Sequence, residues 1–183
     1  MKFIPTTLKD AFLVDLNPFQ DQRGLFARTF DKELFKSINH TKEFVQFNHS
    51  VNYFKGTLRG LHYQVIPSAE IKLVRCIQGS VYDVIVDVRE NSPTFLQHIG
   101  VELSESNLRM IYIPEGFAHG FQTLEDNTQM LYHHSNYYNP ASERGIRHND
   151  SMLNIHWPLE PTVMSDKDQQ YDLLTADFRG IEV

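Results

Sequence analysis

Short runs rich in Val, Ile, Tyr and Phe recur along the chain, and Gly, Pro and Asn separate them at frequent intervals. Apolar runs of this length between turn residues predict β-strands. Several strands at short, regular spacing favour a sandwich or barrel over alternating β–α units. We expect strands at Glu43–Phe54, Ile71–Ile77, Ser80–Val88, His98–Leu103, Arg109–Ile113, Ala118–Leu124 and Gln129–Ser135.

The run Ser80–Val88 shows the clearest alternation. Successive side chains of a strand point to opposite faces, so one face carries Tyr82 and three valines. The other face carries Asp83 and Asp87 between apolar residues. Two acids on this second face predict that it reaches solvent or a polar cavity.

Helical patterns are few. Asp31–Ile38 predicts a short helix with Asp31 as its N-cap, and Ser165–Leu174 predicts another that Ser165 caps. The proline-rich segment Trp157–Met164 is expected to be extended, because a residue before proline disfavours helix.

Composition narrows the protein class. A chain of 183 residues favours one domain, residues 1–183, with a substantial core. A net charge of -6 argues against a nucleic-acid-binding protein. No apolar run approaches the ~20 residues of a membrane span, and the N-terminus lacks the apolar region of a signal peptide. The single Cys76 excludes an internal disulfide framework and fits a reducing compartment, so we expect a cytoplasmic protein.

The stretch GTLRGLHYQ, Gly56–Gln64, places charged side chains in a strand-like run. Arg59 and His62 face opposite sides of a regular strand, because their separation is odd. Gly60 between them is typical of a β-bulge, which would turn both side chains into one cavity. Without a bulge, Arg59 faces solvent and His62 is a hydrogen-bonded wall residue.

A second motif, IPEGFAHGF, contains Pro-x-Gly-x-x-His and ends at His119. It resembles the second motif of the cupin superfamily, whose fold is a double-stranded β-helix jelly roll. The first motif of metal-binding cupins supplies His-x-His and a glutamate, but here Gln64 replaces the second histidine. A carboxamide is a poor metal ligand, and the ammonium of Lys72 would repel a cation nearby. We interpret the pocket as metal-free.

Eight sequence blocks, in order and over nearly the whole chain, resemble the dTDP-4-dehydrorhamnose 3,5-epimerase family. They are Phe19–Phe30, Phe44–Ser50, Gly56–Gln64, Lys72–Phe95, Ile113–Phe121, Leu131–Pro140, Gly145–Asp150 and Trp157–Asp168. The resemblance implies an all-β, cupin-type jelly roll with a few short peripheral helices, forming a homodimer. It also implies inversion at C3 and C5 of a nucleotide-linked 4-keto-6-deoxyhexose without a cofactor. Such a reaction belongs to deoxysugar biosynthesis, for surface polysaccharide in the dTDP-rhamnose type of route or for antibiotics.

The resemblance also implies roles for four catalytic residues. His62 would be the base that takes a proton from carbon, and Lys72 would meet the enolate oxygen at C4. Tyr132 would return a proton from the opposite face, since a phenol with a pKa near ~10 stays protonated. Asp168 would hydrogen-bond the base and fix its tautomer.

Further residues match substrate-binding positions of the family. Arg59 and His119 would line the sugar site, and Arg23 would bind pyrophosphate through its bidentate donors. The remaining matches are Phe26, Arg28, Gln46, Asn48, Tyr138 and Glu143.

Each assignment has a structural alternative. Asp168 also completes a capping-box-like helix start with Ser165, and Lys72 is also an edge-strand charge that resists aggregation. Tyr132 also suits a half-buried wall position, and Arg23 suits a surface turn. His133 and His134 match no family role, and we assign them to the surface or the wall.

Three positions depart from the family pattern. Arg28 stands where the family typically has Glu at the nucleobase, Glu70 replaces a common Gln, and His148 replaces a common Trp. Arginine offers only donors, which suits the acceptors of cytosine. Recognition of the base is therefore predicted to differ, with a CDP-linked sugar, or inversion at only one carbon, as alternatives.

Two other function classes compete with an epimerase. One is a metal-dependent cupin enzyme that uses His62, Glu70 and His119, and metal analysis of the protein separates it. The other is a non-catalytic sugar-binding jelly roll, which would show no solvent deuterium exchange into a bound sugar.

Overall fold

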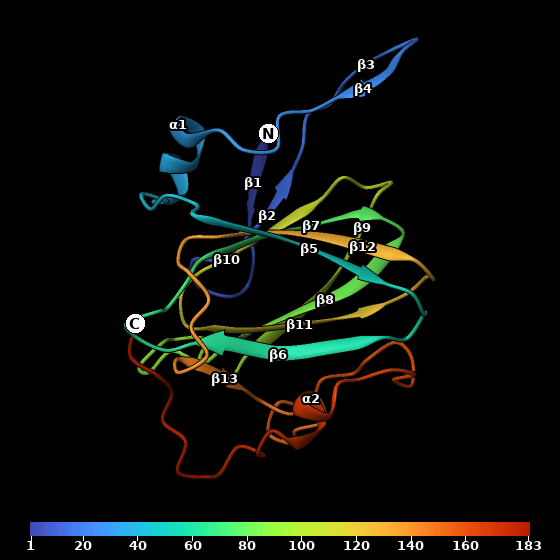
Figure 1. Ribbon diagram of the computed structural model, residues 1–183. Coiled ribbons are helices and arrows are strands. Elements are labelled where there is room, and N and C mark those ends of the chain that lie inside the picture. Colours follow the sequence, from blue (N-terminus) through green and yellow to red (C-terminus); the bar gives the residue numbers. More distant parts are fainter.

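Two antiparallel β-sheets face each other in the computed structural model, which describes residues 1–183 (Figure 1). In spatial order the first sheet contains β1 (Lys2–Pro5), β2 (Phe12–Asp15), β10 (Met110–Ile113), β7 (Lys72–Gln78), β12 (Thr128–His134) and β5 (Gln46–Asn52). The second contains β13 (Glu143–Gly145), β6 (Leu58–Gln64), β11 (Phe117–Thr123), β8 (Ser80–Asp87) and β9 (His98–Ser104).

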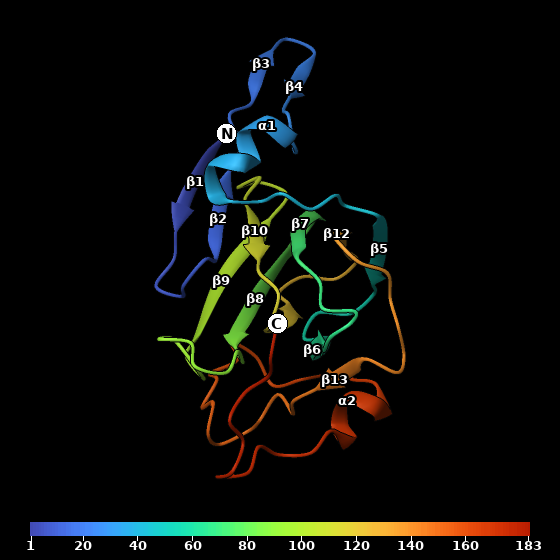
Figure 2. The same ribbon diagram turned by 90° about the vertical axis from the view of Figure 1, so that its left-hand side faces the viewer.

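The remaining elements lie outside the two sheets. β3 (Phe19–Asp21) and β4 (Gly24–Phe26) form a hairpin that projects from one end of the molecule in both views (Figures 1 and 2). Helix α1 (Lys32–Phe35) continues into a 3₁₀ turn (Lys36–Ile38), and α2 (Asp166–Gln170) lies beside the second sheet. The arrangement confirms the predicted all-β jelly roll with short peripheral helices. No helix is long and apolar enough to span a membrane.

Apolar side chains fill three layers. The space between the sheets holds the largest cluster, which includes Val74, Ile85 and Phe121. Outside the second sheet, the C-terminal segment packs Leu153 against the outer face of β8, and outside the first sheet α1 packs Phe35. Because both outer faces are covered in this way, the buried cluster between the two sheets is enclosed by packed structure on both sides.

The strand β8 is buried on both faces. Its valine face packs under the C-terminal segment rather than facing solvent. Its second face points between the sheets, where Asp83 hydrogen-bonds His119. Asp83 and Asp87 are both fully buried. The prediction that this face reaches a polar interior is therefore correct, and the alternative that it reaches solvent is wrong.

The predicted strands occur with boundaries within about one residue, except β5. It begins at Gln46, three residues later than expected, and ends at Asn52, two residues earlier than expected. Asp31 caps α1, and Ser165 caps α2, as predicted. Helix α2 ends at Gln170, so the predicted extension to Leu174 is wrong. The short strands β1, β2, β3, β4 and β13 were not predicted, because runs of three or four residues carry little periodicity.

Candidate active site

The pairing of β6 with β11 contains the bulge that Gly60 predicted. His62 pairs with His119 and Arg59 pairs with Phe121, so two residues of β6 oppose one residue of β11. Gly60 has a φ of +107°, and a Cβ there would lie 2.6 Å from a backbone oxygen of β11. Only glycine accommodates this close approach. The bulge turns Arg59 and His62 toward the same interior.

A cavity of about 260 Å³ lies between the sheets. Side chains from β5, β6, β7, β11 and β12 meet there, although they come from distant parts of the sequence. The lining residues are Asn48, His49, Ser50, Arg59, His62, Lys72, His119, Gly120, Phe121, Tyr132 and His134. The structure therefore brings three of the four predicted catalytic side chains, and both predicted sugar-site residues, to one cavity.

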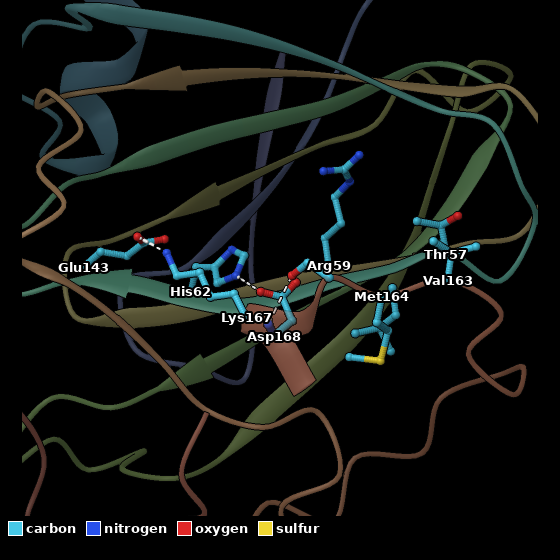
Figure 3. Close-up of a pocket in the computed structure, with 10 residues that line it drawn as sticks. Thr57, Arg59, His62, Glu143, Val163, Met164, Lys167 and Asp168 are labelled. Carbon is cyan, nitrogen blue, oxygen red and sulfur yellow. Dashed lines mark hydrogen bonds and ion pairs between the residues drawn. The ribbon is translucent and has the colours of Figure 1, made fainter. Parts of the chain in front are cut away.

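The fourth predicted catalytic residue, Asp168, contacts His62 on the side away from the cavity. Its Oδ1 lies 2.7 Å from His62 Nε2, and its Oδ2 accepts from the Gly60 N–H at 3.1 Å. Figure 3 shows His62 and Asp168 joined in this way, with the other ring nitrogen of His62 directed away from the carboxylate. The carboxylate fixes the proton of neutral His62 on Nε2 and leaves Nδ1 with a free lone pair.

Asp168 is buried, at 3% exposure. Burial by itself raises the pKa of its carboxyl group, but the hydrogen bonds and charge of His62 and the Gly60 N–H outweigh it and hold the pKa below its usual value. Asp168 is thus a carboxylate at neutral pH. Its backbone N–H also bonds Ser165 Oγ at 3.1 Å, so the capping role and the contact with His62 coexist.

Lys72 is buried in the wall, with its side chain 8% exposed. Its ammonium lies 3.4 Å from Glu70 Oε1 and 3.4 Å from the backbone oxygen of His62. Lys72 is therefore not an edge-strand charge, because β7 is central in the first sheet. A buried cation at a cavity wall suits an oxygen that becomes negative.

Tyr132 lies across the cavity from β6, on the first sheet. Its hydroxyl is 3.4 Å from Ser50 Oγ, and its ring lies between His119 and His134. Burial raises the pKa of its phenol, with a smaller opposing effect from Ser50. The hydroxyl thus keeps its proton at neutral pH and can donate it.

Two further interior side chains have fixed orientations. His119 Nε2 lies 2.9 Å from Asp83 Oδ2, and Arg59 Nε donates to Asn52 Oδ1 at 2.7 Å. Each side chain is tethered at one end, so Arg59 keeps its other N–H donors and His119 keeps one ring nitrogen for a ligand. Such tethers hold donors in place before a ligand arrives.

A second cavity of about 380 Å³ lies between β6 and α2 and shares Arg59 and His62 with the first (Figure 3). Lys167 and Glu143 line it and form an ion pair with each other. Sequence analysis missed Lys167. Its position next to Asp168, one residue earlier in the same capped turn, was the available signal.

The other predicted binding residues divide into two groups. Asn48 lines the first cavity, Glu143 lines the second, and Gln46 and Tyr138 bond to each other near β5.

The second group lies far from this cluster. Arg23 and Phe26 are on the projecting hairpin, and Arg28 follows it and pairs with Asp31 at 2.6 Å. The structure does not bring these three residues to the cavity of their own chain.

The donor set of the rival metal hypothesis does not converge. His62 bonds Asp168, His119 bonds Asp83, and Glu70 bonds His134 and Lys72. No group of three His, Cys, Asp or Glu side chains is placed to share an ion. Each ligand of that set has a different partner in the fold.

An imidazole with a free lone pair, an ammonium and a protonated phenol thus surround one interior space. This combination suits removal of a proton from a carbon acid next to a carbonyl, with the charge held on oxygen and a proton returned from another side.

Comparison with known proteins gives a consistent result. The family model for dTDP-4-dehydrorhamnose 3,5-epimerase matches residues 5–176. The chain is similar to the dTDP-4-dehydrorhamnose 3,5-epimerase of Shigella flexneri, with 46% identity over 92% of this chain and 93% of the relative.

Solved structures agree with the sequence comparison. An epimerase of the same name from Bacillus anthracis, with TDP and PPi bound, has a TM-score of 0.91 at 43% identity and covers 94% of this chain and 99% of its own. A dTDP-6-deoxy-D-glucose-3,5-epimerase from Legionella pneumophila, in complex with dTDP-4-keto-L-rhamnose, has a TM-score of 0.89 at 40% identity, covering 94% and 92%.

Proposed function

The chain belongs to the dTDP-4-dehydrorhamnose 3,5-epimerase family, and on that premise we propose how its own residues carry out the reaction. It is an isomerase that epimerises a nucleotide-linked 4-keto-6-deoxyhexose next to the C4 ketone. We assign the base to His62, the oxyanion partner to Lys72 and the acid to Tyr132.

The proposed steps balance protons with water as the only other reactant. Nδ1 of His62 takes the proton from C3 or C5, and the electron pair moves through the new C=C bond onto the C4 oxygen. The ammonium of Lys72 stabilises that oxygen. Tyr132 then gives its proton to the opposite face of the same carbon as the ketone re-forms. Asp168 stabilises the imidazolium until His62 releases the extra proton to water and the tyrosinate takes one up from water.

One observation carries this assignment: His62, Lys72 and Tyr132 line the same interior cavity from three different strands. The test is solvent exchange. The protein in D₂O should introduce deuterium at C3, C5 or both of a dTDP-linked 4-keto-6-deoxyhexose. Absence of label with dTDP-, CDP- and GDP-linked substrates contradicts the assignment and supports a binding protein.

We further propose that the protein is a homodimer in which the β3–β4 hairpin of one subunit reaches the partner's site. Exposed apolar side chains on the hairpin and the edge strand β5 support this, with Phe19 67%, Phe26 77% and Phe47 66% exposed. Arg23 and Phe26 match substrate-binding positions of the family, but they belong to the hairpin and do not line the interior cavity of their own chain. A second copy would let them serve a neighbouring one.

Analytical ultracentrifugation tests the proposed dimer, because it measures the mass of the protein in solution. The wild-type chain should sediment at twice its 21.3 kDa mass, and Phe47→Glu should shift it toward the monomer. Glu33→Gln, a change at an exposed ion pair on α1, is the matched control and should leave the mass unchanged. A monomeric wild type contradicts the dimer.

We also propose a cytoplasmic location and a place in deoxysugar biosynthesis that feeds a surface polysaccharide such as an O-antigen. Cys76, the single cysteine, is a buried free thiol, which fits a reducing compartment. Fractionation of cells that produce the protein tests the location.

A further inference from the structure

Glu70 is a buried acid to which the proposed steps give no role. It precedes β7, and its side chain is 8% exposed. One carboxylate oxygen faces Lys72 Nζ at 3.4 Å, and the other faces His134 Nδ1 at 2.7 Å. Buried charges persist in proteins when each has a partner, and here one carboxylate serves two side chains.

Glu70 is ionised at neutral pH. Burial raises the pKa of its carboxyl group, but the hydrogen bond from His134 and the charge of Lys72 outweigh burial and lower the pKa below its usual value. No other carboxylate lies within ion-pair distance of Lys72. The nearby Glu143 is occupied by Lys167 and Tyr138, and Asp168 by His62. Glu70 is therefore the one carboxylate that holds the Lys72 ammonium.

A directional hydrogen-bond chain leads from Glu70 to strand β5. Since a carboxylate only accepts, His134 must donate from Nδ1. Its Nε2 then accepts from Asn48 Nδ2 at 3.2 Å, and Asn48 Oδ1 accepts from Gln46 Nε2 at 3.3 Å. The orientation of the Asn48 amide thus follows from the charge on Glu70.

We propose that Glu70 is a positioning residue for the epimerisation. One of its oxygens anchors the Lys72 ammonium at the cavity wall, where it meets the enolate oxygen. The other oxygen holds His134 as the tautomer with its proton on Nδ1, which orients Asn48 toward the cavity. This inference rests on the proposed function, because it needs Lys72 to act on the C4 oxygen.

Two substitutions test whether Glu70 anchors the Lys72 ammonium or only fills space in the wall. Glu70→Ala removes both contacts and should lower kcat by about 10- to 100-fold, because a displacement of about 1 Å at a reacting group costs that much. The fall in kcat should exceed the rise in KM, since the Lys72 contact acts on the transition state and the Asn48 contact acts on substrate binding. Glu70→Gln keeps an acceptor for Lys72 and should restore kcat to within about threefold of wild type.

The tautomer of His134 is a second test, because a purely structural role of Glu70 would not determine which ring nitrogen carries the proton. In wild-type protein, two-bond ¹H–¹⁵N spectra of the imidazole ring should show the proton on Nδ1. In Glu70→Gln the amide NH₂ faces His134, so the ring proton should move to Nε2. His134→Ala identifies the resonance. A wild-type proton on Nε2 overturns the inference.

Controls keep the outcomes distinct. Glu33→Ala breaks the exposed ion pair with Lys36 and should leave kcat and the His134 resonance unchanged. Wild-type kcat in a folded Glu70→Ala variant overturns the inference and leaves the proposed function intact. If Glu70→Ala does not fold, the tautomers of wild type and Glu70→Gln decide. Full activity in His62→Ala would instead contradict the proposed function.

Discussion

The interior cavity and the β3–β4 hairpin both carry basic side chains, but the side chain in the cavity is buried and the one on the hairpin is exposed. Lys72 in the cavity has a side chain 8% exposed, whereas Arg23 on the hairpin is 83% exposed. Lys72 is held by Glu70 and by the backbone of the opposite sheet, but Arg23 contacts only Asp21 on its own hairpin. Both Arg23 and Lys72 match functional positions of the family.

The difference lies in preorganisation. In the cavity, Lys72 is held by Glu70 and by the backbone of β6, and His62 is held by Asp168 of α2, so these groups keep their positions before substrate binds. On the hairpin, water screens the ion pair, and the apolar side chains beside it lack cover. The cavity is thus ready for chemistry within one chain, while the hairpin depends on a ligand or a second subunit.

The largest expected effect lies in the cavity. His62→Ala should lower deuterium exchange at both C3 and C5 by about 10²–10⁴-fold, the usual contribution of a general base. The nucleotide affinity should stay nearly intact, because the hairpin and β5 are unchanged. Exchange followed by mass spectrometry, with calorimetric titration of dTDP, measures both. Full exchange in the variant shows that another group is the base.

Tyr132→Phe should separate the two proton transfers. Exchange should partly survive, because His62 still removes the proton, but inversion should fall by about 10²-fold without the acid. Comparing label uptake with the yield of inverted sugar measures the difference. Equal losses of exchange and inversion would assign Tyr132 a different step.

The pH dependence of stability should differ between the buried carboxylate Asp168 and the exposed carboxylate Asp21. Asp168→Asn should lower the free energy of unfolding by about 1.5–3 kcal/mol at neutral pH, the range for a hydrogen bond to a charged group. Since the folded-state pKa of Asp168 is lowered, its contribution is present above the unfolded pKa of ~3.9 and disappears as pH falls through the lower folded value. Denaturant unfolding at several pH values should show the gap to wild type narrowing below about pH 4.

The hairpin carboxylate supplies the control for this experiment. Asp21→Asn should change the free energy of unfolding little at any pH, because its pair with Arg23 is exposed. A larger pH-dependent loss in Asp21→Asn than in Asp168→Asn would reverse the comparison between the two regions.

Arg23→Ala should weaken the affinity for dTDP by about tenfold, as expected when one charge-assisted bond to a phosphate is lost. Unfolding of the subunit should not change, because the side chain contacts only its own hairpin. Lys36→Ala, at an exposed pair on α1, is the control for the calorimetric titration. Unchanged affinity would assign Arg23 to the surface turn.

The smallest effect concerns the nucleobase. Arg28 bonds Asp31 near α1 in the isolated chain, and its donors predict that dTDP does not protect against thermal unfolding far better than CDP. Thermal shifts at matched nucleotide concentrations measure this. Much stronger protection by dTDP would mean that Arg28 does not read the base.

The amino-acid sequence specified the longer strands and the two helix caps, because alternation and capping are local. The run of β8, the Asp31 and Ser165 caps and the glycine of the bulge were all readable from a few neighbouring residues. The family blocks also marked His62, Lys72, Tyr132 and Asp168 as a set before any geometry was known.

Partnerships between distant residues came only from the folded chain. His62 and Asp168 are 106 positions apart, and Glu70 and His134 are 64 apart, so no local pattern predicts which acid serves which base. The sequence also did not predict that Arg23 lies far from the cavity, because the order of motifs along a chain does not give the distance between them in the fold. Sheet register and packing create these contacts, because they bring together strands that the sequence places far apart.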